Sequence, residues 1–456
     1  MKIIIAGAGR IGYSIAAELS KEKNDISVIE CNETRVEEIY NSLDIQVYKG
    51  NGANYDVLAQ AGAANADLVI AVTHADETNL LCCLTAKKLG TKRTIARVRD
   101  REYRKQIALL KDELGITMII NPEEATANEI SRILRYPAAS KVEPFANSRA
   151  ESVEIRVGED SPLNGLQISN FHSKIADKVL ISAVSRGKEA IIPRGDFTLQ
   201  TGDRLNLIGS YKEMNNFLRK NNSFRHGIKT VLILGAGRTT SYLIQRIINS
   251  GMKVKIIEKN ERMCEELKLA FPKAELVLAD GTKSEVLLEE GLADADAFLA
   301  ATGDDEDNVI TSMYALSLGT RKVITKINES HIIKMLAGSN LDSIVQPSSI
   351  ATQRVVQYVR SVQNAYDTNS VDRMYYMFEG RVEALEFIIN ENTPFIGSPI
   401  KDLSLASDVL IAAIIRKGVC IIPSGDDVIS PGDSVIITTT RSAISRFEDI
   451  VEDYIR

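Results

Sequence analysis

The feature that most constrains the fold is an internal duplication. The stretch "KIIIAGAGRIG" returns as "TVLILGAGRTT", so that Gly7 matches Gly235 and Glu30 matches Glu258, each pair 228 residues apart. The likeness continues well beyond the loop, because "GNGANYDVLAQAGAANADLVIAVTHADETN" aligns with "ADGTKSEVLLEEGLADADAFLAATGDDEDN". At 456 residues the chain is too long for one compact core. We therefore expect two similar halves.

Each half contains two kinds of domain. The first shows short apolar strands, "KIIIAG", "DISVIE", "IQVYKG", "DLVIAV" and "RTIARV", separated by helix-length amphipathic segments, a pattern typical of a parallel sheet built from β-α-β units. The second, of about 70 residues, shows strands "VEIRV", "VLISAVSR", "EAIIP" and "DRLNLIG" between Pro, Gly and Asp turns, with a short helix ending near Arg219. The predicted class is α/β, with two Rossmann-type parallel-sheet domains alternating with two small α+β domains.

The predicted domains run in the order 1–140, 141–222, 228–370 and 371–456, with the polar stretch "KNNSFRHGIK", Lys220 to Lys229, as linker between the halves. The first and third are the Rossmann-type domains, and the second and fourth are the small ones. Each Rossmann-type domain contains, near its end, a helix with a proline at its start, in "NPEEATANEISRILRY" and "QPSSIATQRVVQYVRS".

The first glycine loop carries the complete G-x-G-x-x-G pattern directly after an apolar strand. In such a strand-loop-helix turn Gly7 permits the tight turn, Gly9 lets the backbone approach a pyrophosphate, and Gly12 lets the helix pack closely on the strand. The phosphates then lie on free N–H groups at the start of the helix. Because the loop has this context, it predicts nucleotide binding.

An acidic residue at the end of the second strand, Glu30, supports this interpretation. Its carboxylate could accept hydrogen bonds from both ribose hydroxyls, whereas a 2′-phosphate would meet like charge, which favours NAD over NADP. The same adenosine subsite could hold ATP or ADP, and the alternative is a solvated residue at a strand end. Asn51 and Thr73 end the next strands and could line the adenine and ribose side of the cleft.

The second glycine loop keeps Gly235 and Gly237 but has Thr240 where the third glycine belongs. The turn and the phosphate approach survive, while Thr240 adds bulk where helix and strand should be closest. Because Glu258 and Asp280 remain, this half could bind a nucleotide more weakly or with a different preference. The alternative is a scaffold retained without a ligand.

An arginine stands at the same place in both loops, Arg10 in the first and Arg238 in the second. A guanidinium there could reach phosphates of its own ligand or of a neighbouring subunit's ligand. An ordinary surface arginine is the alternative.

Composition excludes several classes of function. The net charge of −6 and the lack of a long basic segment argue against general attraction to nucleic acid or anionic lipid. No charged leader precedes the first strand, and the apolar runs are shorter than the ~20 residues of a membrane span, so we expect a cytosolic protein. The five cysteines and four histidines show no zinc-ligand spacing, which predicts ordinary thiols and no metal site.

The alternating domains and the stretches "GAGRIG", "VIE", "GNGANYDVL" and "AVTHADETN", with their counterparts in the second half, make the chain resemble the TrkA family of Trk system potassium uptake proteins. Members of that family carry two tandem RCK (regulator of potassium conductance) domains, each an RCK_N and an RCK_C part, and the resemblance covers essentially the whole chain. It implies a regulator, peripheral on the inner face of the cell membrane, that assembles as a tetrameric ring under a potassium-translocating subunit of the TrkH or TrkG type.

The resemblance also implies which residues contact the nucleotide, NAD(H) or else ATP or ADP. By the same resemblance, the bound nucleotide would change the shape of the ring and thereby open or close the potassium-translocating subunit. The family's contacts fall in the first half on Gly7, Gly9, Arg10, Ile11, Glu30, Asn51 and Thr73, with Gly12 in the loop and Arg97 as an outer contact, and in the second half on Gly235, Gly237, Arg238, Glu258 and Asp280.

Two other classes of function compete with a regulator. An NAD-dependent dehydrogenase would need a proton donor facing the nicotinamide, but His172 is the sole histidine of the small domains and its counterpart region has none. A nucleotide-sensing DNA-binding protein would need a basic recognition helix, which the chain lacks. We therefore expect no catalytic residues.

Overall fold

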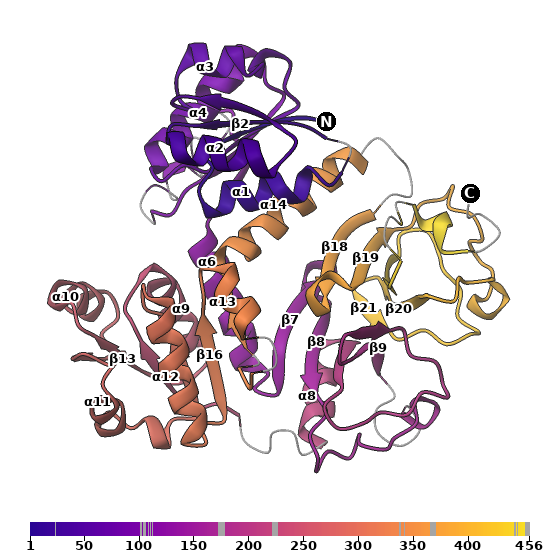
Figure 1. The fold of residues 1–456 in the computed structure, drawn as a ribbon. Helices are drawn as coiled ribbons and strands as arrows, with labels where there is room; N and C mark the ends of the chain where they lie inside the picture. Colours follow the sequence, from indigo (N-terminus) through magenta and orange to yellow (C-terminus); the bar gives the residue numbers. More distant parts are fainter. Residues whose placement is uncertain are drawn as a thin grey trace. The chain divides into compact units, whose positions relative to one another are not determined.

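The computed structural model in Figure 1 describes residues 1–22, 24–100, 113–171, 178–220, 227–336, 339–341, 343–364, 371–441, 444 and 446–451, with 103, 106, 107, 109 and 111. His172 and most of the predicted linker, 221–226, lie outside the described residues. The chain divides into two compact units, Met1–Ala127 with Gln346–Val359, and Asn128–Val345 with Arg360–Arg456. The four predicted domain limits remain predictions.

The first unit contains a six-stranded parallel sheet in the order β3-β2-β1-β4-β5-β6, which is the strand order of a dinucleotide-binding Rossmann fold. Its strands are near-continuous apolar runs because helices cover both faces; Ile3, Ile4 and Ile5 of β1 are all fully buried. The elements are β1 (Lys2–Ala6), β2 (Asp25–Glu30), β3 (Gln46–Lys49), β4 (Leu68–Ala71), β5 (Arg93–Arg97), β6 (Met118–Ile120), α1 (Arg10–Leu19), α2 (Glu33–Ser42), α3 (Tyr55–Gln60) and α4 (Asp76–Leu89).

Helix α14 (Pro347–Asn364) belongs to the second half of the sequence but completes the core of the first sheet. Val355 and Val359 are fully buried in the same cluster as Ile95 and Ile120, on the face that α1 also covers (Figure 1). Ala351, four residues before Val355, continues this stripe along the helix. Spacing of this kind puts the small apolar side chains on one face. The predicted helix with a proline at its start is confirmed.

The second unit contains the second parallel sheet, in the equivalent order β14-β13-β12-β15-β16-β17. Helix α6 (Pro122–Arg135), from the first half, contacts this domain, because Arg246 of α9 donates from Nε to Asn128 Oδ1 at 2.7 Å. The elements are β12 (Thr230–Leu234), β13 (Lys253–Glu258), β14 (Glu275–Leu278), β15 (Ala297–Ala300), β16 (Lys322–Lys326), β17 (Ile344–Val345), α9 (Arg238–Asn249), α10 (Glu261–Ala270), α11 (Ser284–Glu289), α12 (Asp305–Ser317) and α13 (Ser330–Met335).

Two antiparallel sheets form the small domains, so the predicted fold class is confirmed. Their orders are β10-β9-β11-β8-β7 and β18-β19-β22-β20-β21. The elements are β7 (Ala139–Phe145), β8 (Ala150–Arg156), β9 (Val179–Arg186), β10 (Glu189–Ile191), β11 (Arg204–Gly209) and α8 (Tyr211–Lys220), then β18 (Val371–Met377), β19 (Val382–Ile388), β20 (Val409–Arg416), β21 (Val419–Ile421) and β22 (Ser434–Thr439).

The two small domains pack against each other. One hydrophobic cluster joins Phe145 and Ala183 of the first to Phe378 and Ala413 of the second. Burial of these apolar side chains holds the small domains of the two halves together. Within the described part of the chain, none of the helices combines the length and the apolar composition that crossing a bilayer requires.

Candidate functional site

The first glycine loop has the backbone that its sequence predicts. Gly7 has φ +97°, a conformation that favours glycine, and Gly9 precedes α1 without any side-chain cap on the first turn of the helix. A Cβ atom on Gly12 would lie 1.9 Å from the carbonyl oxygen of Gly7, so no larger residue fits without moving the helix. The N–H groups at the start of α1 are thus placed to bind an anion.

Glu30 connects the end of β2 to the glycine loop. One carboxylate oxygen accepts the N–H of Ala8 at 2.7 Å, and the other accepts the N–H groups of Cys31 and Asn32, both at 2.9 Å. Burial by itself would raise the pKa of Glu30, but the donors from Asn32, Ala8 and Cys31 outweigh it and hold the pKa below the usual value. The carboxylate is therefore ionised at neutral pH and already holds the loop in shape.

The other predicted contacts of the first half lie at the same edge of the sheet, because the strands of a parallel sheet all have their carboxyl ends at one edge. Thr73, after β4, donates from its hydroxyl to Asn79 Oδ1 at 2.8 Å, and its N–H donates to the same atom at 2.7 Å. Asn79 in turn donates to the carbonyl oxygen of Arg97 at 3.0 Å. Asn51, after β3, is exposed and accepts the N–H of Ala53.

Basic side chains lie close to the first loop. Arg10 is exposed at the first position of α1, while the side chain of Ile11 is buried in the core and leaves only its backbone for a ligand. Sequence reasoning missed Arg35, on α2, whose Nη1 donates to the carbonyl oxygen of Ala8 at 3.2 Å. This guanidinium adds positive charge beside the glycine loop.

The second loop accommodates Thr240 through a hydrogen bond. The fully buried Thr240 donates from Oγ1 to the carbonyl oxygen of Gly235 at 2.7 Å, the equivalent of the atom that Gly12 approaches in the first loop. Gly235 keeps φ +100°, and Gly237 again precedes its helix without a side-chain cap. Glu258 repeats the role of Glu30, because it accepts the N–H of Ala236 at 2.7 Å. Threonine has altered the packing of this loop while its turn is retained.

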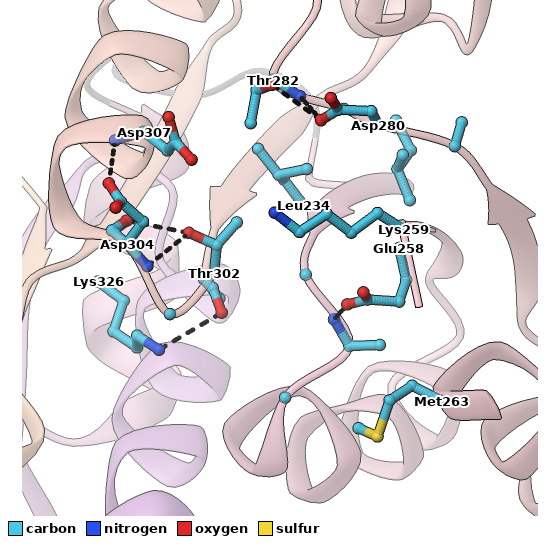
Figure 2. A pocket seen from close by; sticks show the side chains of 18 residues that line it. Leu234, Glu258, Lys259, Met263, Asp280, Thr282, Thr302, Asp304, Asp307 and Lys326 are labelled. Atoms are coloured by element: carbon cyan, nitrogen blue, oxygen red, sulfur yellow. Dashed lines mark hydrogen bonds between the residues drawn. The ribbon is translucent and has the colours of Figure 1, made fainter. Parts of the chain in front are cut away.

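A pocket of about 440 Å³ lies at the carboxyl edge of the second sheet (Figure 2). Four of the five residues predicted for this half line it, Gly235, Gly237, Glu258 and Asp280, whereas Arg238 is not among the lining residues. The pocket also includes residues that the sequence did not single out, namely Lys259, Met263, Thr282, Thr302, Asp304, Asp307 and Lys326. Among the residues that the structure describes, no group of three or more His, Cys, Asp or Glu side chains could hold a metal ion.

A fully buried asparagine organises each site and was not predicted as a site residue. Asn308 accepts the N–H and the hydroxyl of Thr302 at 2.9 and 2.8 Å and donates to the carbonyl oxygen of Lys326 at 3.0 Å, which repeats the bonds of Asn79. The aligned pair Asn79 and Asn308 was visible in the duplication, but nothing in the sequence distinguished its structural role from ligand contact.

Replacing Asn79 by alanine should destabilise the carboxyl edge of the first sheet by about 2 kcal/mol, because it leaves the N–H of Thr73 and the carbonyl oxygen of Arg97 without their partner. Native-state hydrogen exchange of the β4 and β5 amides would measure the change. The exposed Asn51→Ala is the control and should change these amides little. Unchanged exchange rates in Asn79→Ala would contradict the role that we assign to this side chain.

Two family models match the chain, each of them twice. The TrkA-N domain matches residues 3–122 and 231–347, and the TrkA-C domain matches residues 153–221 and 384–452. Among similar proteins, the Trk system potassium uptake protein TrkA homolog of Archaeoglobus fulgidus is 32% identical over 450 residues, which cover 99% of this chain and 100% of that protein. The Trk system potassium uptake protein TrkA of Halomonas elongata is 31% identical, with 96% and 95% covered.

Solved structures with the same fold include the GsuK channel bound to NAD, with a TM-score of 0.63 and 17% sequence identity over 96% of this chain and 76% of that one. The GsuK RCK domain has the same TM-score and identity, with 92% of that chain covered. At this level of identity the similarity shows the arrangement of tandem parallel-sheet and small domains, and no more than the fold.

Proposed function

Because the chain belongs to the TrkA family of Trk system potassium uptake proteins, we propose that it is a nucleotide-binding regulatory subunit of a membrane potassium-uptake system. It assembles as a ring of four chains on the inner face of the cell membrane, under a potassium-translocating subunit of the TrkH or TrkG type. The observation that carries the proposal is the pair of glycine loops, each followed by a helix whose first turn has no side-chain cap and each held by a carboxylate.

NAD(H), ATP and ADP are the ligands that suit this geometry. The helix N-termini would hold phosphates, and Glu30 and Glu258 would face the ribose hydroxyls at the ends of β2 and β13. The fold is shared with GsuK, of which one structure contains NAD and another ADP, and this supports the choice of ligands. Gly7, Gly9, Arg10, Asn51 and Thr73 are the proposed further contacts of the first half, with Arg97 outside them.

A regulator of this kind works by population shift. A nucleotide that binds two conformations of the ring unequally moves their equilibrium by that difference in affinity. The chain is not an enzyme: its full-length relatives are potassium uptake proteins, and no bond need be made or broken for this role. The duplication supports it too, since covalent pairs of Rossmann-type domains suit a symmetric membrane partner.

Removing the chain from its cell should lower potassium uptake severalfold while the membrane subunit remains present, because the gate loses the subunit that biases it. Rubidium influx would measure uptake, and immunoblotting of the membrane subunit is the control. Unaltered influx would contradict the proposal. A second assay follows NADH absorbance in the presence of purified chain and candidate metabolites, where steady oxidation would instead support a dehydrogenase.

A further inference from the structure

The two nucleotide sites share a backbone frame but differ in charge. The third strand end carries Asp280 where the first half has Asn51, and the loop after the fourth strand carries Asp304 and Asp307 where the first half has Ala75 and Thr78. The second half also gains one positive charge and loses another, since Lys259 stands in place of Cys31 and Met263 in place of Arg35. Lys326 keeps the positive charge of Arg97.

The added charges separate into two sides of the second pocket. On the adenosine side Asp280 accepts the hydroxyl of Thr282 at 2.8 Å, and its pKa is held below the usual value by that hydrogen bond and by the charges of Lys283 and Lys259. The positive charge of Lys259 therefore offsets the negative charge of Asp280 on the adenosine side. Asp304 and Asp307 lie on the opposite wall of the pocket, at the start of α12 (Figure 2).

The start of α12 fixes the Asp304 carboxylate and places Asp307 in the first turn of the helix. Asp304 caps the helix, since its Oδ1 accepts the N–H of Asp307 at 2.9 Å, whereas α4 of the first half begins after Ala75 without a side-chain cap. Lys326, which stands where the first half has Arg97, is a cation common to both walls and donates to the carbonyl oxygen of Ala301 at 3.4 Å. The wall that follows β15 is thus more negative than its counterpart in the first half.

A dinucleotide would span both sides of this pocket. With its adenine ribose at Glu258 and its pyrophosphate on the start of α9, the other nucleotide extends over β15 toward Asp304 and Asp307. In NAD⁺ that end is a positively charged nicotinamide ring, and in NADH the ring is neutral. A carboxylate near the ring favours the cation, and the attraction decreases with added salt.

We propose that the second pocket distinguishes the redox state of its ligand, binding NAD⁺ more tightly than NADH through Asp304 and Asp307, while the first site does not. The proposal rests on the nucleotide-binding function proposed above and adds a sensor of the oxidised cofactor to it. We expect the second pocket to bind NAD⁺ on the order of tenfold more tightly than NADH, because two carboxylates would attract the single positive charge of the ring at a protein surface.

The test is calorimetric titration of the full chain with NAD⁺ and, separately, with NADH. The binding event that disappears in the Glu258→Ala variant is assigned to the second pocket. The key variant is Asp304→Asn with Asp307→Asn, because asparagine keeps the size and the helix cap but removes the charge. The NAD⁺ preference should fall to within about twofold in this variant, and should decline with added salt in the wild type. The reciprocal Ala75→Asp with Thr78→Asp should create a preference in the first site.

Equal affinities of the wild-type second pocket for NAD⁺ and NADH would overturn the inference, as would a preference that survives in the double asparagine variant. Binding confined to the first site would also overturn it, while leaving the proposed function intact. Absence of nucleotide binding at both sites would overturn the proposed function itself. The four outcomes are therefore distinguishable in one set of titrations.

Discussion

Replacing Gly12 by alanine is expected to weaken nucleotide binding at the first loop by roughly a hundredfold. The new Cβ would lie 1.9 Å from the carbonyl oxygen of Gly7, a contact between two stretches of backbone that only a movement of α1 can relieve. That movement carries the helix N-terminus away from the phosphates, and losing two charge-assisted hydrogen bonds of about 1.5 kcal/mol each gives this factor. Overpacking should also destabilise the first unit by about 1 to 3 kcal/mol.

Calorimetric titration with NADH and thermal unfolding would measure the two effects. The second loop supplies the matched control, because Thr240→Gly removes a hydroxyl bonded to Gly235 without adding any atom. It should cost about 1 to 2 kcal/mol of stability and leave binding at the first loop unchanged. If Gly12→Ala bound NADH as tightly as the wild type, the close approach of α1 to β1 would not be what positions the phosphate.

Glu30→Ala should have an effect of similar size for a different reason. The carboxylate that would bind the ribose hydroxyls is also the acceptor for the N–H groups of Ala8, Cys31 and Asn32. Its removal takes away the ligand contacts and loosens the loop before any ligand arrives. Loss of two bonds to a charged acceptor again predicts an affinity roughly a hundredfold lower, measured by titration.

The pH dependence checks the same group. Because the pKa of Glu30 is lowered in the folded chain, its contribution to stability is present above the ordinary glutamate pKa and is lost as pH falls through the lowered folded value. Wild-type NADH affinity should therefore persist to more acidic pH than an ordinary glutamate would allow. Glu258→Ala is the control, and should leave the first site unaffected. If the Glu30→Ala variant bound NADH with wild-type affinity, the adenosine would have to bind away from Glu30.

Local patterns were enough to predict most of the framework. The apolar strands alternate with helical segments in both halves, and the turn between β1 and α1 needs glycine at Gly7 and Gly12 for reasons that depend only on neighbouring backbone. Strand β7 was not among the predicted strands; it contains Pro144, which is tolerated because β7 pairs on one side only, at the edge of its sheet. Its edge position became visible in the tertiary structure alone.

Side-chain partners within the sites were less predictable. The sequence placed Thr240 where a glycine belongs, and bulk was the expected consequence; the hydrogen bond to Gly235 depends on where α9 sits relative to β12. Asn79 and Asn308 were aligned as a pair, but their burial and their bonds across neighbouring strands required coordinates. Arg35 reaches the glycine loop from a helix that is distant from it in sequence.

The sequence by itself determined that the chain is duplicated, that each half begins with a parallel-sheet domain, and that each of these domains carries a glycine loop and an acidic residue at the end of its second strand. Each of these conclusions depends only on the order and spacing of residue types along the chain, and so needs no knowledge of tertiary contacts. The tertiary structure alone decided that α14 would pack on the sheet of the first half, because an apolar stripe specifies that a helix face is buried without specifying against which sheet. It also brought Asp304 and Asp307 to the wall opposite Lys259 and Asp280, since separate strands meet at that edge only after the sheet has formed.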